Sequence, residues 1–224
     1  MSQDNIISHT LLIVILLIVV LVFGGLAIFA LYWSWQLNDE TVYNNTKFRT
    51  IKRFHDHNKA LDKLFELDNI TKTLIARINN KVRSSSYSSG NIVLEEIAYN
   101  LNLNLHHITM QEVDPTWTTG HRAFTKNKRD ISICLRKKDG TFYDKNLIKF
   151  VFIHELAHIG TDPRYTEAHS PEFWRTFKIL LVEADKAGLL RVINYGEKKN
   201  NTEYCSIKVD YNPYFDDSIS LKGF

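Results

Sequence analysis

A long uncharged stretch near the N-terminus constrains this chain more than any other feature. No Asp, Glu, Lys or Arg occurs over Asn5–Asn38, and Leu11–Trp33 is apolar without interruption. As a helix, the apolar run is about 34 Å long, which is enough to cross the hydrocarbon core of a bilayer, about 30 Å thick. Aromatic residues gather at its end, as they do at membrane interfaces, at positions Tyr32, Trp33 and Trp35.

We interpret this stretch as an uncleaved anchor and not as a cleaved signal peptide. A signal peptide has a basic segment before an apolar core of about 7–15 residues, and this chain shows neither. We therefore expect residues 1–36 to be a transmembrane anchor whose partner is the lipid bilayer, through Leu11–Trp33. The anchor excludes a purely soluble protein, and a net charge of +3 gives no reason to expect nucleic-acid binding.

The Lys and Arg residues that flank the anchor predict its orientation. The first ten residues contain neither type, whereas the other flank carries Lys47, Arg49, Lys52 and Arg53. The positive-inside rule then places the C-terminal domain in the cytosol.

Two further features bear on this orientation. Three N-glycosylation sequons begin at Asn44, Asn69 and Asn200, and they point to the opposite side of the membrane. The two cysteines, Cys134 and Cys205, are expected to be buried free thiols in a cytosolic domain. A disulfide between them would argue for the opposite topology.

The rest of the chain predicts a stalk followed by one α+β domain. Apolar residues recur at three- and four-residue steps over residues 44–82, which is typical of an amphipathic helix, with a break possible near Asp56. The Ser-rich run Ser84–Gly90 has the composition of a flexible linker. We therefore expect residues 37–90 to form a helical stalk and linker, and residues 91–224 to form the domain.

Within the domain, alternation and capping residues predict its helices and strands. Ile92–Leu101 indicates a helix, whereas Leu105–Val113, Ile131–Leu135 and Cys205–Asp210 indicate strands. Two further helices are expected, and their ends are marked by turn and capping residues. The first runs from an N-cap at Asp144 through His158 to a stop at Gly160, and the second starts at Ser170-Pro171 and ends at Gly188.

The first of these two helices carries the sequence His-Glu-Leu-Ala-His at 154–158. Residues four apart lie on one face of a helix, so His154 and His158 could bind one metal ion. Glu155 lies about 100° further around the helix, where it could reach a water molecule on that metal. The sequence therefore predicts a zinc site with Glu155 as the general base.

A catalytic zinc needs a third protein ligand and an open position for water. His169 is the best candidate, because it directly precedes the helix start at Ser170 and imidazole suits zinc. Glu183 on the following helix is the alternative, and Glu167 and Glu172 are weaker options.

These motifs resemble the WLM/SprT-like zinc metallopeptidases. HELAHIG followed by HSPEFW, from His169 to Trp174, is similar to the family pattern of HExxH, a loop, a histidine and an aromatic pair. The similarity covers about residues 122–188 and is greatest to small membrane-anchored members from large DNA viruses of eukaryotes. It implies a zincin-like fold with a small mixed sheet, the zinc ligands His154, His158 and His169, and Glu155 as general base. It also implies a host or virion membrane.

The expected activity is hydrolysis of peptide bonds in a protein or peptide substrate. Zinc would activate a water molecule, and Glu155 would take its proton and pass it to the leaving nitrogen. Candidates for an additional oxyanion donor are Tyr165, Arg164 and Arg122, and the Ile131–Leu135 strand could pair with an extended substrate. The alternatives are a membrane-anchored scaffold that binds zinc without catalysis, and a viral membrane protein.

Overall fold

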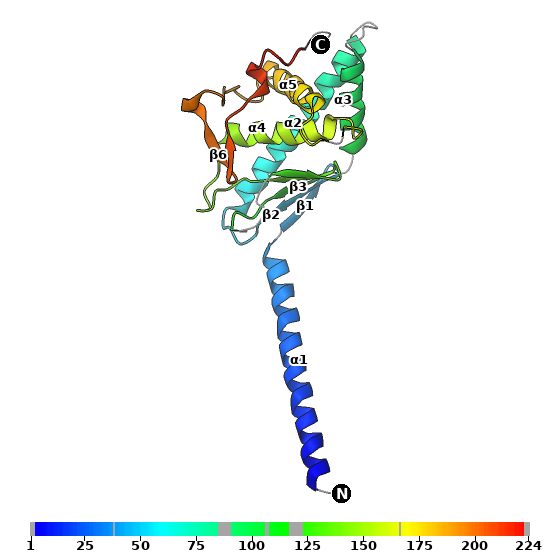
Figure 1. The fold of residues 1–224 in the computed structure, drawn as a ribbon, viewed down its shortest axis with the longest axis vertical. Helices are drawn as coiled ribbons and strands as arrows, with labels where there is room; N and C mark the ends of the chain where they lie inside the picture. The colour runs from blue at the N-terminus through cyan, green and yellow to red at the C-terminus, as the bar shows by residue number, and fades with distance from the viewer. Residues whose placement is uncertain are drawn as a thin grey trace. The chain divides into compact units, whose positions relative to one another are not determined.

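The computed structural model describes residues 3–37, 39–84, 91–105, 108–116, 123–165 and 167–221. The chain divides into two compact units, Met1–Asn38 and Asp39–Phe224. The first contains a single helix, and the second contains both sheets and the other helices that the structure describes (Figure 1).

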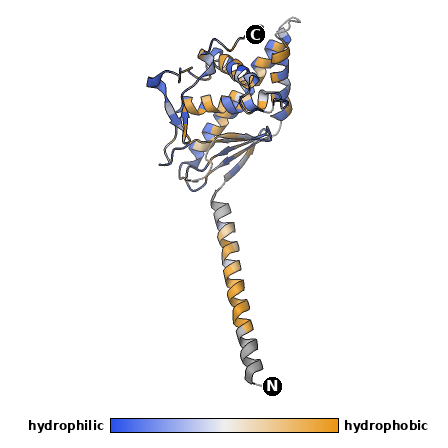
Figure 2. Ribbon diagram, viewed as in Figure 1, coloured by the Kyte–Doolittle hydropathy of each residue, from blue (hydrophilic) through white to orange (hydrophobic). Residues whose placement is uncertain are grey.

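The N-terminal unit is the helix α1, Gln3–Leu37. Its segment Leu12–Tyr32 is long and apolar enough to cross a membrane, and a signal sequence would meet the same criterion. Side chains in this segment are exposed all round, and the colours of Figure 2 mark most of its residues as hydrophobic. An apolar surface of this size is unstable in water, so this helix requires a bilayer or a partner of similar polarity.

The second unit is built on a five-stranded mixed sheet in the order β1-β2-β3-β5-β4. β2 and β3 run parallel, as do β3 and β5, whereas β1 and β4 pair antiparallel at the two edges. The strands are β1 Asp39–Tyr43, β2 Thr46–Thr50, β3 Thr109–Glu112, β4 Phe124–Lys126 and β5 Asp130–Ile133. The α+β class predicted from the sequence is confirmed.

One face of this sheet is buried beneath the helices. Phe48 lies beside Met110, and Met110 lies beside Ile131, so three neighbouring strands contribute one apolar row. Alternate positions such as Lys47 and Gln111 are less buried, as the two-residue period of a strand requires. Figure 1 shows the long helices of this second unit gathered on the same side of the sheet.

Four long helices of this unit are described: α2 His57–Ser84, α3 Asn91–Asn104, α4 Lys145–Gly160 and α5 Pro171–Lys186. The caps predicted at Asp144 and Ser170 are confirmed. The Asp144 carboxylate accepts hydrogen bonds from two backbone N–H groups of the first turn of α4, and the Ser170 hydroxyl accepts one from Phe173. Short 3-10 helices cover Lys198–Asn200 and Pro213–Phe215.

The prediction of a separate stalk over residues 37–90 is wrong. Part of this segment is strand, because β1 and β2 belong to the main sheet. α2 packs on β2 and on α3, α4 and α5, and it buries one apolar side of its surface in the common core, through Leu64, Leu67, Ile70, Leu74 and Ile78. The amphipathic stripe was correctly identified for α2, but it faces this domain's own core.

A buried cluster of charged residues connects the segment 37–90 to the sheet. Arg136, only 2% exposed, contacts the Glu112 carboxylate at 2.8 Å and the Asp56 carboxylate at 2.8 Å. Glu112 also accepts a hydrogen bond from the backbone N–H of Ile51 at 3.0 Å. The boundary expected at residue 91 is therefore not a boundary between compact units.

The C-terminal end of the chain forms a hairpin, where the sequence predicted one strand over Cys205–Asp210. Its strands are β6, Thr202–Tyr204, and β7, Ile207–Val209, and Cys205 and Ser206 form the turn between them with positive φ. The expectation of free thiols is also wrong, because Cys134 and Cys205 form a disulfide. That bond connects the hairpin to the segment that follows β5.

Candidate metal centre

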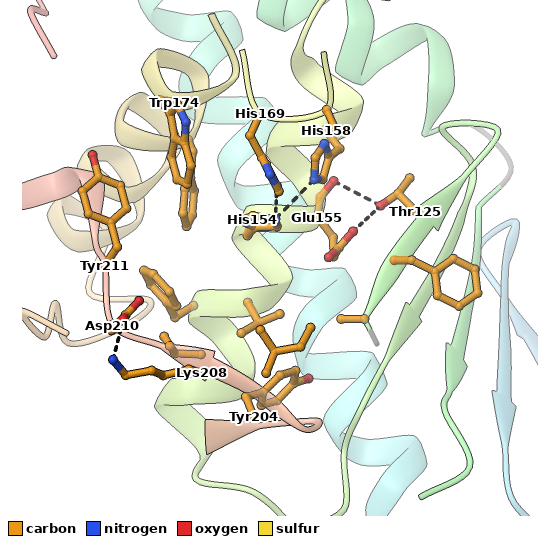
Figure 3. A pocket seen from close by; sticks show the side chains of 18 of the residues that line it. Thr125, His154, Glu155, His158, His169, Trp174, Tyr204, Lys208, Asp210 and Tyr211 are labelled. Atoms are coloured by element: carbon orange, nitrogen blue, oxygen red, sulfur yellow. Dashed lines mark hydrogen bonds and ion pairs between the residues drawn. The ribbon is translucent and has the colours of Figure 1, made fainter. Parts of the chain in front are cut away.

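The three predicted histidines come together in the structure. The Nε2 atoms of His158 and His169 each lie 3.2 Å from Nε2 of His154 (Figure 3). One ring nitrogen from each residue lies within 4.8 Å of the others, and we call this group the three-histidine cluster. Each histidine thus points a potential ligand atom at the same small volume.

The spacing of these nitrogens fits a tetrahedral metal ion. With Zn–N bonds of about 2.0–2.1 Å, two tetrahedral ligands lie about 3.3–3.4 Å apart. Three imidazoles with no carboxylate among them suit zinc better than calcium or magnesium, which prefer oxygen ligands. The donor set therefore fits the metal that the motif implies, with room for a water molecule on the cleft side.

The surroundings keep these histidines uncharged, which metal binding requires. Burial lowers the pKa of His154 to about 3, and the neighbouring His158 and His169 add to this effect. Burial also lowers the pKa of His158 to about 4, with contributions from His169 and Lys128. At neutral pH both rings have a lone pair available for a metal.

Two elements hold the three ligands. His154 and His158 are one turn apart on α4, whose apolar residues Phe152, Ile153 and Leu156 are buried in the core. His169 directly precedes Ser170, the residue that caps α5. Because that cap fixes the start of a packed helix, it also fixes the position of His169.

Aromatic rings of α5 surround the imidazoles. The Trp174 indole stacks on the His169 ring with a centroid distance of 5.4 Å. Phe173 and Phe177 pack against His154 at centroid distances of 4.9 and 5.2 Å. The aromatic pair after His169 therefore has a physical role, because it restricts ligand rotation and excludes water from one side of the cluster.

Glu155 is buried next to the cluster and is held by a residue that the sequence did not suggest. Its side chain is 4% exposed, and its Oε2 atom accepts a hydrogen bond of 2.9 Å from the Thr125 hydroxyl on β4. Burial raises the pKa of Glu155 to about 7, although the bond from Thr125 opposes this rise. A carboxyl group in this range can accept and release a proton near neutral pH.

Glu183 does not join the three-histidine cluster. It is fully buried, and its carboxylate lies 2.9 Å from an Arg77 guanidinium nitrogen and 3.0 Å from Lys81 Nζ, both on α2. The alternative His2Glu site is therefore wrong for this structure. Glu167 and Glu172 also lie outside the group of converging ligand atoms.

Two of the three candidate oxyanion donors, Arg164 and Tyr165, do not lie at the cluster. Arg164 pairs with Asp162 at 2.7 Å and with Glu96 at 3.2 Å, so its guanidinium faces α3. Tyr165 is 40% exposed and does not line the cleft that contains the cluster. Arg122 lies outside the residues that the structure describes.

The cluster opens into a cleft of about 670 Å³. One wall is β4, and the opposite wall includes the β6–β7 hairpin (Figure 3). Most of the lining is apolar or aromatic, including Phe150, Trp174, Phe177, Tyr204, Ile207 and Tyr211. A volume of this size is typical of a site for a small molecule or for a few residues of a peptide.

Neither cleft wall could be recognised from the sequence as part of the site. Thr125 lies on a strand of only three residues, and Tyr204 and Ile207 lie far from the motif along the chain. The predicted substrate-pairing strand was also misplaced. β5 is flanked by β3 and β4, whereas β4 is the edge strand beside the cluster.

Comparison with known proteins gives two viral relatives. The chain is 38% identical over 73 residues to uncharacterized protein 136R of Invertebrate iridescent virus 6, and 30% identical over 114 residues to uncharacterized protein R325 of Acanthamoeba polyphaga mimivirus. The matched segments are 31% and 49% of this chain, and 39% and 53% of those relatives. No family model and no solved structure matches.

Proposed function

We propose that this chain is a zinc-dependent peptidase of the WLM/SprT-like kind, carried on a viral or host membrane by α1. The observation that supports this most is the combination of three converging imidazoles with a buried, oriented carboxylate at the same cleft. A closed structural zinc site has four protein ligands, whereas three ligands and an adjacent base suit a site that binds water.

A zinc ion held by His154, His158 and His169 would supply Lewis acidity and would lower the pKa of a water molecule on it to about 7. Glu155 would act as the general base, because its carboxyl group is buried beside the cluster and could hold a proton and deliver it to the leaving nitrogen of the scissile bond. Thr125 holds the carboxylate in position through its hydroxyl. The α5 aromatics limit the access of bulk water from one side.

The cleft indicates the class of substrate. β4 is an edge strand, so its free backbone groups could pair with an extended peptide that passes the three-histidine cluster. The apolar lining next to the cluster favours a large aliphatic or aromatic side chain beside the scissile bond. We therefore expect cleavage of extended, flexible segments in preference to cleavage within folded domains.

The test begins with zinc content and proceeds to hydrolysis. A fragment from residue 39 onward keeps β1, β2 and α2, which a fragment from residue 91 would lose. We expect about one zinc per chain by elemental mass spectrometry and cleavage of members of an unbiased peptide library by mass spectrometry.

Glu155→Gln should lower kcat about 1,000-fold and leave zinc content unchanged, because it removes the base and keeps the side-chain shape. Glu167→Gln makes the same chemical change on an exposed loop and should retain activity. Equal activity in the Glu155→Gln variant would contradict the mechanism. Zinc binding without any cleavage would favour a non-catalytic scaffold.

A further inference from the structure

The two cysteines of this chain are both used in one buried disulfide. Cys134 is 2% exposed and Cys205 is 8% exposed, and their Cα atoms are 6.1 Å apart, within the usual range for a disulfide. The backbone N–H of Cys205 also donates a hydrogen bond of 2.8 Å to the Tyr143 hydroxyl, which fixes the hairpin turn at the same place. A buried bond of this kind forms during folding, in a compartment that oxidises thiols.

The positive charges used to predict a cytosolic domain begin only at Lys47, well beyond the end of the membrane-spanning segment Leu12–Tyr32. The stretch 33–46, directly after the membrane-spanning segment, contains two acidic residues and no Lys or Arg. Long domains also cross membranes largely regardless of their charge.

The structure separates two of the three sequons, those at Asn69 and Asn200, by the accessibility of their acceptor amides. Asn69 lies on the exposed side of α2, and its amide makes no hydrogen bond to any residue that the structure describes. Asn200 is partly buried, and its Nδ2 atom donates a hydrogen bond of 2.9 Å to the Asn194 carbonyl. A glycan can project into solvent from Asn69, whereas at Asn200 it would displace a contact of the fold.

We propose that the domain Asp39–Phe224 folds on the extracytosolic side of the membrane and carries an N-linked glycan at Asn69 when a eukaryotic cell makes the full chain. The N-terminus of α1 then remains in the cytosol. Asn200 stays unmodified. This proposal does not depend on peptidase activity, because it rests on the disulfide and on the acceptor geometry.

Two covalent steps are implied. The thiols of Cys134 and Cys205 lose two protons and two electrons to a dithiol–disulfide oxidoreductase, which is reduced as the S–S bond forms. At Asn69, a glycosyl C1–oxygen bond of a lipid-linked pyrophosphate donor breaks and a C1–Nδ2 bond forms. The amide loses one proton, and the lipid pyrophosphate is the leaving group.

The test uses the full-length chain expressed in cultured eukaryotic cells. We expect peptide N-glycosidase to increase the electrophoretic mobility of the wild-type chain. Asn69→Gln should migrate as a chain with one glycan fewer, and Asn200→Gln should migrate like the wild type. Asn44 is unchanged in every variant, so a glycan at that sequon would be common to all of them and would not affect the differences between them. In denatured samples, which expose both residues, the cysteines should react with a maleimide–polyethylene glycol reagent only after reduction.

Protease treatment of sealed microsomes provides a readout that does not require glycosylation. The domain should be protected until detergent is added. Digestion in intact microsomes, or free thiols before reduction, would overturn the extracytosolic placement. If the domain is protected but Asn69→Gln migrates like the wild type, the assignment of the glycan to this residue is overturned. None of these readouts involves peptide hydrolysis, so their failure would leave the proposed function standing.

Discussion

Two charged or polar clusters lie at the two ends of α5, and they differ in how their groups are satisfied. At the C-terminal end, the Glu183 carboxylate is fully buried and is paired with Arg77 and Lys81. At the N-terminal end, the histidine side chains of the three-histidine cluster are not fully buried, and Nε2 of His154 lies 3.2 Å from Nε2 of both His158 and His169. In the first cluster, neighbouring cations already balance the charge, whereas the second brings together neutral donors that can bind an added cation.

This difference shows why residue type alone does not identify a ligand. A carboxylate and an imidazole can both bind zinc, and the sequence placed Glu183 and His169 on or next to the same helix. Only their surroundings distinguish Glu183 from His169. Among the described ion pairs, α2 places two cations beside Glu183 and none beside His169. A buried charge with its partners stabilises a fold, whereas convergent neutral donors at an open cleft indicate a binding site.

The largest effect is expected for His169→Ala. The loss of one ligand of three should weaken zinc binding at least about 1,000-fold. Removal of a residue that only hydrogen-bonds to a ligand already lowers metal affinity about 10–100-fold. Competition with a chelator measures this affinity. Glu183→Gln serves as the matched variant, and it should bind zinc with wild-type affinity. If His169→Ala kept its zinc and Glu183→Gln lost it, Glu183 and not His169 would be the third ligand.

Glu183→Gln should instead lower the free energy of unfolding by about 3 kcal/mol, because it leaves two cations without their buried partner. Urea unfolding of the fragment from residue 39 measures this change. Glu66→Gln is the control, since Glu66 is partly exposed beside Lys145 and Lys149 and should contribute about 1 kcal/mol or less. Similar losses in both variants would contradict a special role for Glu183.

The effect of Glu183 should also depend on pH. Burial raises the pKa of Glu183, but Lys81 and Arg77 lower it by more, so it lies below its ordinary value. A carboxyl group with a lowered pKa stabilises the fold above its unfolded pKa of about 4.3, and this stabilisation is lost as the pH falls through the folded pKa. The gap in stability between wild type and Glu183→Gln should therefore narrow below about pH 4.

The smallest effect is expected for Thr125→Val, which removes the hydroxyl and keeps the shape. We expect kcat to fall about tenfold, equivalent to about 1.4 kcal/mol, near the lower end of what a hydrogen bond to a charged group contributes. KM and zinc content should change little, because Thr125 acts through Glu155. Thr125→Ser should restore most of the rate, and a loss of zinc in Thr125→Val would contradict a positioning role.

The features that the sequence predicted correctly depend on short separations along the chain. The caps at Asp144 and Ser170, the spacing of His154 and His158, and the position of His169 before a helix start all lie within local patterns. The α+β class follows from the same local periodicities. These parts of the fold and of the site could be predicted because each signal lies within one or two turns of a helix.

Apart from the local errors at β2 and at the turn of the β6–β7 hairpin, what the sequence missed involves contacts between distant segments. The pairing of β2 with β3, the disulfide between Cys134 and Cys205, and the bond from Thr125 to Glu155 each join residues well apart in the sequence. An amphipathic helix looks the same whether its apolar side packs on its own domain or on a separate partner. The stalk prediction failed for this reason, and so did the prediction of free thiols.

Gly160 shows how closely the geometry of the site depends on packing outside it. It is the last residue of α4, and a Cβ atom there would lie 3.3 Å from the Thr176 methyl group of α5 and 3.5 Å from Ile97 of α3. Asn100 of α3 also donates a hydrogen bond to its carbonyl. An added methyl group would thus push against α5, the helix whose start holds His169. The distance between His169 and the two histidines of α4 therefore depends on the missing side chain at Gly160.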